Sequence, residues 1–347
     1  MLSVVAGSGT TDADTNRLLL GVLRRSTGRA DLAFGDPPSP ISGGFDARLL
    51  RFRLESPPPD LDRELVARIV ARSPLGRFEA EVQRRVADAG IPTPVVRLAV
   101  DDPDGLGGFV IVMDHVPGRP PLAGLGPAAV LGNLPRLTRQ LPDQLASVAG
   151  RLHAVDPAPV ERALRSEGTE VPITAVELAE HLSAAAEDRG RGALVGACGD
   201  LLRHRPDGGT RAVTHGDLHP FNLIDGPDGT VLIDWTLAAI AHPAFTLAFT
   251  QLVLAHPPIA LPTPARTALG PIARAMARRF TTTYRTLCPD ADDHLDPTQL
   301  DWHRRLHALR ILVEMSAWDG DAPAGHPWLI LAPIARQILD RPRGPSS

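Results

Sequence analysis

The sequence of 347 residues predicts an α+β fold made of two unlike lobes. Segments with strand periodicity lie in the first third of the chain, whereas the remainder shows mostly helical periodicity. The length also exceeds the ~250 residues near which a single hydrophobic core stops growing. We therefore expect a small β-rich lobe over residues 1–115 and a larger helical lobe over residues 116–347. A site between the lobes follows from this arrangement.

The N-terminal lobe is predicted from changes in periodicity along the chain. Alternating apolar residues Leu50, Phe52 and Leu54 indicate a strand, whereas Phe78, Val82 and others recur every four residues and indicate a helix. The predicted elements are a helix over 14–28, a turn and strand over 41–55, a strand over 64–70, a helix over 77–90, and two strands over 94–100 and 108–116.

The C-terminal lobe is predicted to be helical, with one interruption. Helices are expected over 141–155, over 173–188 and repeatedly from residue 244 onward. The apolar run at 245–255 is too short to span a bilayer, so we interpret it as a core helix. The interruption is a pair of short strands around residues 213–235, where the polar motifs lie.

Composition narrows the classes of function. Apolar and charged contents of 43% and 22% are typical of a globular protein. A net charge of −4 and 4% aromatic residues favour neither a basic face nor a base-stacking surface, so no nucleic-acid partner is expected. The start of the chain has no signal-peptide pattern, and we expect a cytoplasmic protein without a membrane partner. No feature of the sequence predicts the oligomeric state.

Residues 213–224 read VTHGDLHPFNLI, and LIDW follows at 232–235. Phosphoryl transfer needs a carboxylate beside the acceptor hydroxyl, and Asp217 is the candidate. Asn222 follows at the D-x-x-x-x-N spacing of kinase catalytic loops, in which the asparagine oxygen binds magnesium. Asp234 would add a hard carboxylate oxygen to the same ion. The pattern therefore predicts metal-assisted phosphoryl transfer.

These two segments resemble the aminoglycoside phosphotransferase family, which has a bilobal protein-kinase-like fold and phosphorylates small molecules with a nucleotide and magnesium. The resemblance implies ATP or GTP as donor, Mg²⁺ as metal and a small-molecule hydroxyl as acceptor. It also implies that Asp217 is the catalytic base and that His215 supports the catalytic loop. Asn222 and Asp234 are implied as the magnesium ligands.

The resemblance extends to the N-terminal lobe. All 36 basic residues are arginine, so the usual phosphate-binding lysine is absent. Arg68 lies in the corresponding strand, and arginine can grip phosphate with a bidentate fork. Its expected acidic partner is Glu79, with Glu81 as the alternative. The implied nucleotide-binding residues of this lobe are Gly43, Gly44, Arg68, Glu79, Met113 and Asp114.

The sequence departs from the family after Asp234. Where the family has two further acids, this chain has His242 and Thr246. A threonine hydroxyl can accept a hydrogen bond but lacks the strength of a carboxylate. A kinase-like protein that binds nucleotide without transferring phosphate is therefore an alternative. A second alternative takes His215 and His219 as ligands of a non-haem iron, with Asp217 as the carboxylate.

The acceptor is predicted from charge alone. Carboxylates are concentrated at 288–297 and at 318–323, and a cationic acceptor would be attracted to such a surface. Solvated loops are the alternative interpretation. Trp302, Trp318 and Trp328 are either pocket residues or core residues.

Overall fold

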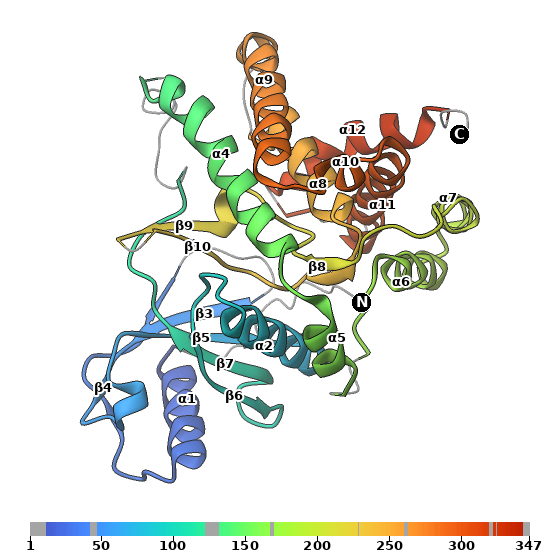
Figure 1. Cartoon of the computed structure of the whole chain (residues 1–347). Helices are drawn as coiled ribbons and strands as arrows, with labels where there is room; N and C mark the ends of the chain where they lie inside the picture. The colour runs from blue at the N-terminus through green and yellow to red at the C-terminus, as the bar shows by residue number, and fades with distance from the viewer. Residues whose placement is uncertain are drawn as a thin grey trace.

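The computed structural model describes residues 12–41, 47–121, 132–166, 170–227, 229–259, 263–318, 322–323 and 325–342. Over these ranges the fold is α+β, with a sheet-rich N-terminal lobe and a helical C-terminal lobe, as the sequence predicts (Figure 1). The last strand of the sheet in sequence, β7 (Gly108–Asp114), ends beside the expected lobe boundary at residue 115. No helix within the described ranges is long and apolar enough to cross a membrane.

A five-stranded antiparallel sheet forms the core of the N-terminal lobe. The strands follow the order β2 (Ser39–Pro40), β3 (Ala47–Phe52), β5 (Leu65–Val70), β7, β6 (Val96–Asp102). A separate two-stranded ladder joins β1 (Ala33–Phe34) to β4 (Leu54–Glu55). The predicted strands at 64–70, 94–100 and 108–116 correspond to β5, β6 and β7 and are thus confirmed. In β5 and β7, β-branched residues fill positions that are buried on both faces.

Two helices cover the opposite faces of this sheet and decide where Arg68 points. Ala67 packs with α1 (Asp12–Thr27), whereas Val66 packs with α2 (Ser73–Asp88). Because side chains alternate along a strand, Arg68 lies on the same face as Val66. This places the guanidinium on the α2 side, next to the helical lobe.

The C-terminal lobe consists mainly of helices packed around buried apolar side chains. They are α4 (Leu134–His153), α5 (Pro157–Ser166), α6 (Ala175–Asp188), α7 (Gly192–Arg203), α8 (Ala244–Ala255), α9 (Thr263–Leu287), α10 (Ala291–His294), α11 (Pro297–Met315) and α12 (Pro327–Asp340). The predicted core helix at 245–255 is α8, whose residues from Ala244 to Thr250 are all buried.

Helix starts differ most from the prediction. The helix expected over 141–155 begins at Leu134, and the one expected over 77–90 begins at Ser73. Proline is favoured in the first turn of a helix, and Pro135 and Pro74 occupy that turn here. Pro142, near the predicted start, lies inside α4.

Short strands carry the polar motifs between the lobes (Figure 1). β8 (Ala212–Thr214) pairs with β11 (Ala239–Ala241), and β9 (Leu223–Gly226) pairs with β10 (Gly229–Leu232), both antiparallel. Two hydrogen bonds join this region to the N-terminal lobe. The Leu232 N–H donates to the Pro92 carbonyl at 2.8 Å, and the Trp235 indole N–H donates to Thr93 Oγ1 at 2.9 Å.

Candidate functional site

The catalytic loop runs from the end of β8 to the start of β9. Gly216 has φ +70°, and a Cβ there would lie 2.4 Å from the Leu237 carbonyl oxygen and 2.6 Å from Phe245. Only glycine fits this position without displacing the neighbouring chain. The glycine turn brings Asp217 out of the buried strand, and a 3-10 turn at Pro220–Asn222 then returns the chain to β9.

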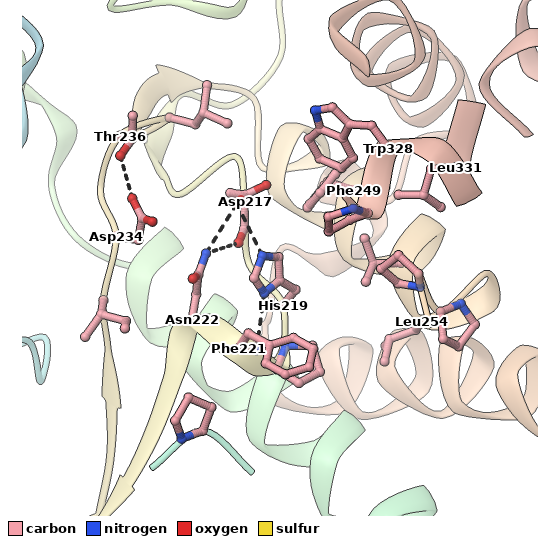
Figure 2. A pocket seen from close by; sticks show the side chains of 18 of the residues that line it. Asp217, His219, Phe221, Asn222, Asp234, Thr236, Phe249, Leu254, Trp328 and Leu331 are labelled. Atoms are coloured by element: carbon pink, nitrogen blue, oxygen red, sulfur yellow. Dashed lines mark hydrogen bonds and ion pairs between the residues drawn. The ribbon is translucent and has the colours of Figure 1, made fainter. Parts of the chain in front are cut away.

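Asp217 is held by three side chains, and Figure 2 shows two of them, Asn222 and His219. Asn222 Nδ2 donates to the Asp217 backbone carbonyl at 2.9 Å and to its Oδ2 at 3.3 Å. His219 Nε2 lies 3.3 Å from the same Oδ2. Arg310 Nη2, from α11, donates to Oδ1 at 3.0 Å. Both carboxylate oxygens therefore have fixed partners.

These partners determine the charge of Asp217. Burial alone would raise the pKa of this carboxyl, but His219 and Arg310 outweigh burial and hold the pKa well below its usual range. The Phe221 N–H donates to His219 Nδ1, so the His219 Nε2 carries the proton and faces Asp217. Asp217 is thus an aligned, ionised carboxylate that can accept a hydrogen bond from an acceptor hydroxyl.

Asp234 lies close to Asn222 although the two are far apart in sequence. The Ile233 N–H donates to the Asn222 carbonyl at 3.0 Å, which fixes the two chain segments against each other. Asp234 has φ +67°, an uncommon conformation for a residue other than glycine and one that clusters at functional sites. Its Oδ1 accepts hydrogen bonds from Thr236 Oγ1 and from Arg68 Nη2, the latter at 3.4 Å.

The oxygen atoms of Asn222 and Asp234 fit a magnesium ion. The Asn222 amide nitrogen is engaged with Asp217, which leaves the amide oxygen as a ligand. The hydrogen bonds from Arg68 and Thr236 to the Asp234 carboxylate both fall on Oδ1, which leaves Oδ2 as a second ligand. Hard oxygen donors of this kind are those that magnesium prefers.

Arg68 connects the N-terminal lobe to this site. Its Nε lies 2.8 Å from Glu79 Oε1, and its Nη2 lies 3.4 Å from Asp234 Oδ1. The arginine and Glu79 are both buried, with 8% and 1% of their surfaces exposed. The alternative partner, Glu81, lies 2.7 Å from Arg85 instead. The predicted pairing of Arg68 with Glu79 is therefore confirmed.

His215 positions the loop and does not face the cavity. Its ring is fully buried, packs at a tilt against Trp235 and donates from Nε2 to the Ile233 carbonyl at 3.0 Å. Burial lowers its pKa, so the ring is neutral. This geometry excludes His215 as an iron ligand through Nε2. Moreover, among the described residues no group of three His, Cys, Asp or Glu side chains is arranged to hold a metal ion.

Two threonines of α8 replace the acid that anchors the loop in the family. Thr246 Oγ1 accepts the His215 N–H at 3.1 Å, and Thr250 Oγ1 donates to the Leu218 carbonyl at 2.9 Å. His242 accepts the Ala244 N–H through Nδ1 at 3.1 Å and so caps the first turn of α8. The loop is anchored on both sides of Asp217, but by neutral hydrogen bonds.

The remaining predicted nucleotide residues are placed unequally. Gly43 and Gly44 lie outside the described residues. Met113 and Asp114 line the cavity between the lobes. The Asp114 carboxylate forms an ion pair with Arg97 at 2.7 Å, and its backbone N–H donates to Val95 within the sheet. What Asp114 can offer a ligand is therefore its backbone carbonyl rather than its charge.

A cavity of about 2290 Å³ unites these groups and is lined by Arg68, Asp217, Asn222 and Asp234. The cavity continues into the helical lobe, where Phe249, Leu254, Trp328 and Leu331 form its wall (Figure 2). It is large enough for a nucleotide together with a second ligand, since ordinary ligand sites occupy ~300–1,000 Å³.

Sequence reasoning missed Arg310 and did not identify His219 as a partner of Asp217. Arg310 follows Asp217 by 93 positions and lies inside a long helix. Charged residues on a helix usually face solvent, and no spacing rule links this arginine to the catalytic loop. The feature of the sequence that could have revealed the contact of His219 with Asp217 is its position two residues after that aspartate. Of the three tryptophans considered, Trp318 and Trp328 line the cavity, whereas Trp302 is buried in the core.

The sequence matches a known protein family. The model of the phosphotransferase enzyme family (APH) matches residues 38–278. That match extends from β2 into α9 and includes every residue of the catalytic loop. No match was found among curated proteins.

Several solved structures have the same fold. An aminoglycoside-3′-phosphotransferase of type VIII is 22% identical with a TM-score of 0.53, over 84% of this chain and 99% of that chain. An amicoumacin kinase in complex with AMP-PNP, Ca²⁺ and its ligand is 17% identical with a TM-score of 0.58, over 92% and 93%. A choline/ethanolamine kinase family protein from Mesorhizobium loti is 16% identical with a TM-score of 0.55, over 94% and 96%.

Proposed function

The chain belongs to the phosphotransferase enzyme family, and from this premise we propose that it transfers the γ-phosphoryl group of ATP or GTP to a hydroxyl of a small molecule, with Mg²⁺ as cofactor. The observation that carries the proposal is the convergence of Asp217, Asn222 and Asp234 with Arg68 at one cavity. These are the groups that phosphoryl transfer requires: a carboxylate for the acceptor, oxygens for the metal and a cation for the phosphates.

Each residue has a part in the reaction. Arg68, oriented by Glu79, is placed to grip the phosphates with its planar fork. The Asp217 carboxylate orients the acceptor hydroxyl and takes its proton as the oxygen attacks the γ-phosphorus. The bond from the γ-phosphorus to the bridging oxygen breaks, and the nucleoside diphosphate leaves with that oxygen. His219 and Arg310 keep Asp217 ionised and aligned until the proton arrives.

Asn222 and Asp234 would hold Mg²⁺ through the amide oxygen and a carboxylate oxygen. When bound, the ion neutralises phosphate charge and holds the leaving oxygens in place. The Arg68 ion pair with Asp234 keeps the carboxylate at the nucleotide end of the cavity. Adenine or guanine would lie against Met113 and the Asp114 carbonyl, at the edge of β7.

The alternative, a silent nucleotide-binding protein, rests on the missing acid at Thr246. Two features argue against it. Thr246 and Thr250 anchor the loop on both sides of Asp217. In addition, Asp217 has the alignment and the charge that a general base requires.

The test is transfer of label from γ-labelled ATP or GTP to a panel of amino sugars, amino alcohols and lipophilic alcohols, with and without Mg²⁺. We expect transfer that requires the metal and that falls by about 10²–10⁴-fold in Asp217→Asn, since general-base catalysis contributes that much. Nucleotide binding, measured as an increase in the thermal stability of the protein, should persist in the variant. Metal-dependent nucleotide binding by the wild-type protein with no transfer to any acceptor would favour the silent protein.

A further inference from the structure

The acceptor end of the cavity is defined here as its lining residues from α8 to α12, beyond Asp217 as seen from Arg68. Most of these side chains are apolar. They include Phe249, Val253, Leu254, Ile259, Ile272, Met276, Trp318, Trp328, Ile330 and Leu331. Figure 2 shows Phe249, Trp328 and Leu331 on the side of Asp217 away from Asp234. A ligand seated here contacts hydrocarbon and aromatic rings.

Carboxylates are scarce at this end. Among the described lining residues from 245 onward, Glu314 supplies the one carboxylate, while Arg274 and Arg310 supply two guanidinium groups. Glu314 accepts the Trp328 indole N–H at 2.7 Å and lies 4.0 Å from Arg310 Nε. Its charge is therefore largely engaged by the protein.

The carboxylates of 288–297, one basis for the expectation of a cationic acceptor, do not belong to the cavity lining. Asp293 accepts a hydrogen bond from Thr210 at 2.6 Å, and Asp292 pairs with Arg285 at 3.4 Å. No residue of 288–297 lines the cavity. Residues 319–321 of the second acidic segment lie outside the described residues. The described part of the acceptor end therefore contains no cluster of free carboxylates that could bind a cation.

Arg310 adds a positive charge where the reacting hydroxyl must lie. Its guanidinium carbon lies 4.7 Å from the Phe249 ring centre and 5.1 Å from the Trp328 ring centre. The side chain is 1% exposed and donates to Asp217 at 3.0 Å. A rigid guanidinium held between two rings cannot turn away. An ammonium group next to the acceptor hydroxyl would meet this fixed like charge.

We propose that the acceptor is a bulky, predominantly apolar alcohol that carries no ammonium group beside the hydroxyl it presents to Asp217. The inference rests on the proposed function and specifies its substrate class. The apolar body packs on the wall formed by Phe249, Trp328 and Leu254, and the hydroxyl reaches Asp217 at the edge of that wall. Burial of hydrocarbon drives binding.

The test compares two panels in the full-length protein with AMP-PNP and Mg²⁺ present. One panel contains large lactone and steroid alcohols, and the other contains polyamino sugars such as kanamycin. Binding is followed by calorimetry at low and high salt. The apolar panel should bind more tightly, with an affinity that changes little with salt. Tighter binding of the polyamino sugars, or no binding of any apolar alcohol at about 1 mM, overturns the inference.

Two matched variants locate the binding surface. Ile259 and Leu287 are both exposed, at 38% and 52%, but Ile259 lines the cavity and Leu287 does not. Ile259→Glu should weaken binding of the apolar panel by roughly fivefold or more, because a carboxylate must be desolvated against hydrocarbon. Leu287→Glu should change it by less than about twofold. A gain in apolar binding from Ile259→Glu, or equal losses in both variants, contradicts the inference.

Failure of this inference is distinguishable from failure of the proposed function. Label transfer to a polyamino sugar but to no apolar alcohol leaves the phosphotransferase activity standing and rejects the substrate class. Binding of the apolar panel at the Ile259 surface without label transfer supports the apolar class of ligand and rejects the proposed phosphotransferase activity.

Discussion

The two ends of the cavity hold their charges in different ways. At the nucleotide end, Arg68 is paired with both Glu79 and Asp234, so each charge has a specific partner from another element. At the acceptor end, Arg310 has one short ion pair, with Asp217, and is otherwise enclosed by the rings of Phe249 and Trp328. One end is a charge network, and the other is a mostly apolar wall with few charged side chains.

The difference reflects what each end must recognise. A triphosphate has the same charge in every relative that uses one, so its site needs the same cation and the same oxygen ligands. An acceptor varies, and an apolar wall adapts to it through shape. The two ends of the cavity meet at Arg310, because this residue contacts both the Asp217 carboxylate and the apolar wall.

Removing the cation at the nucleotide end should have the largest effect. Arg68→Met leaves Glu79 and Asp234 facing the phosphates without a counter-charge, and we expect kcat/KM for ATP to fall by about 10²–10³-fold. Arg68→Lys should recover part of the loss, since lysine supplies the charge without the fork. Steady-state kinetics with ATP varied provide the measurement.

A control for Arg68→Met is Arg51→Met, in the neighbouring strand β3. Arg51 has a half-exposed side chain, pairs with Glu64 at 3.5 Å and does not line the cavity. Its replacement should change kcat/KM by less than about twofold. Equal losses in the two variants would show that Arg68 acts through lobe stability and not through phosphate binding.

Removing the cation at the acceptor end should have a smaller but more diagnostic effect. Burial raises the pKa of Asp217, whereas His219 and Arg310 lower it, and the net direction in the native protein is downward. Arg310→Met removes one of the two groups that lower the pKa, so the pKa must rise. The acidic limb of the kcat profile should therefore move to higher pH, and kcat at neutral pH should fall by roughly tenfold.

A purely structural role for Arg310 would leave that acidic limb in place. Arg310→Lys, which keeps the charge, should return the limb toward its original position even if kcat stays reduced. Thermal unfolding of each variant separates loss of fold from loss of alignment. An unchanged pH profile in a folded Arg310→Met protein would contradict the assigned role.

The contrast between the ends also explains what the sequence reveals. Asp217, Asn222 and Asp234 lie within eighteen consecutive residues, and their spacing alone predicts a metal-assisted site. Arg68 and Glu79 were predicted through the resemblance to the family, which implies a phosphate-binding base in this strand and its acidic partner in the helix that follows. Local spacing therefore places three of the five residues, and the resemblance places the other two.

The acceptor end is determined by packing between distant helices. The periodicity of α11 predicts a helix but does not show that Arg310 faces inward, since arginine normally lies at a surface. Trp328 was as compatible with a core position as with a pocket. The carboxylates at 288–297 were counted correctly, but composition does not locate them, and they lie away from the cavity.

The smallest expected effects concern the anchors shared by both ends. Thr246→Val removes the acceptor of the buried His215 N–H, and Thr250→Val removes the donor to the Leu218 carbonyl. An orphaned buried N–H is rarer in native structures than an under-satisfied carbonyl, which has a second lone pair. Thr246→Val should therefore cost more, about 1–3 kcal/mol of stability, and Thr250→Val should cost less.

Both variants should lower kcat by a few-fold and leave KM for ATP unchanged, because the loop carries Asp217 and contributes little to nucleotide affinity. Thr286→Val is the matched control, since the Thr286 hydroxyl is exposed and bonds within α9 at 3.0 Å. Chemical unfolding and steady-state kinetics give the two readouts. If Thr250→Val proved as damaging as Thr246→Val, the anchoring of the loop would depend on the number of hydrogen bonds and not on which buried group is left without a partner.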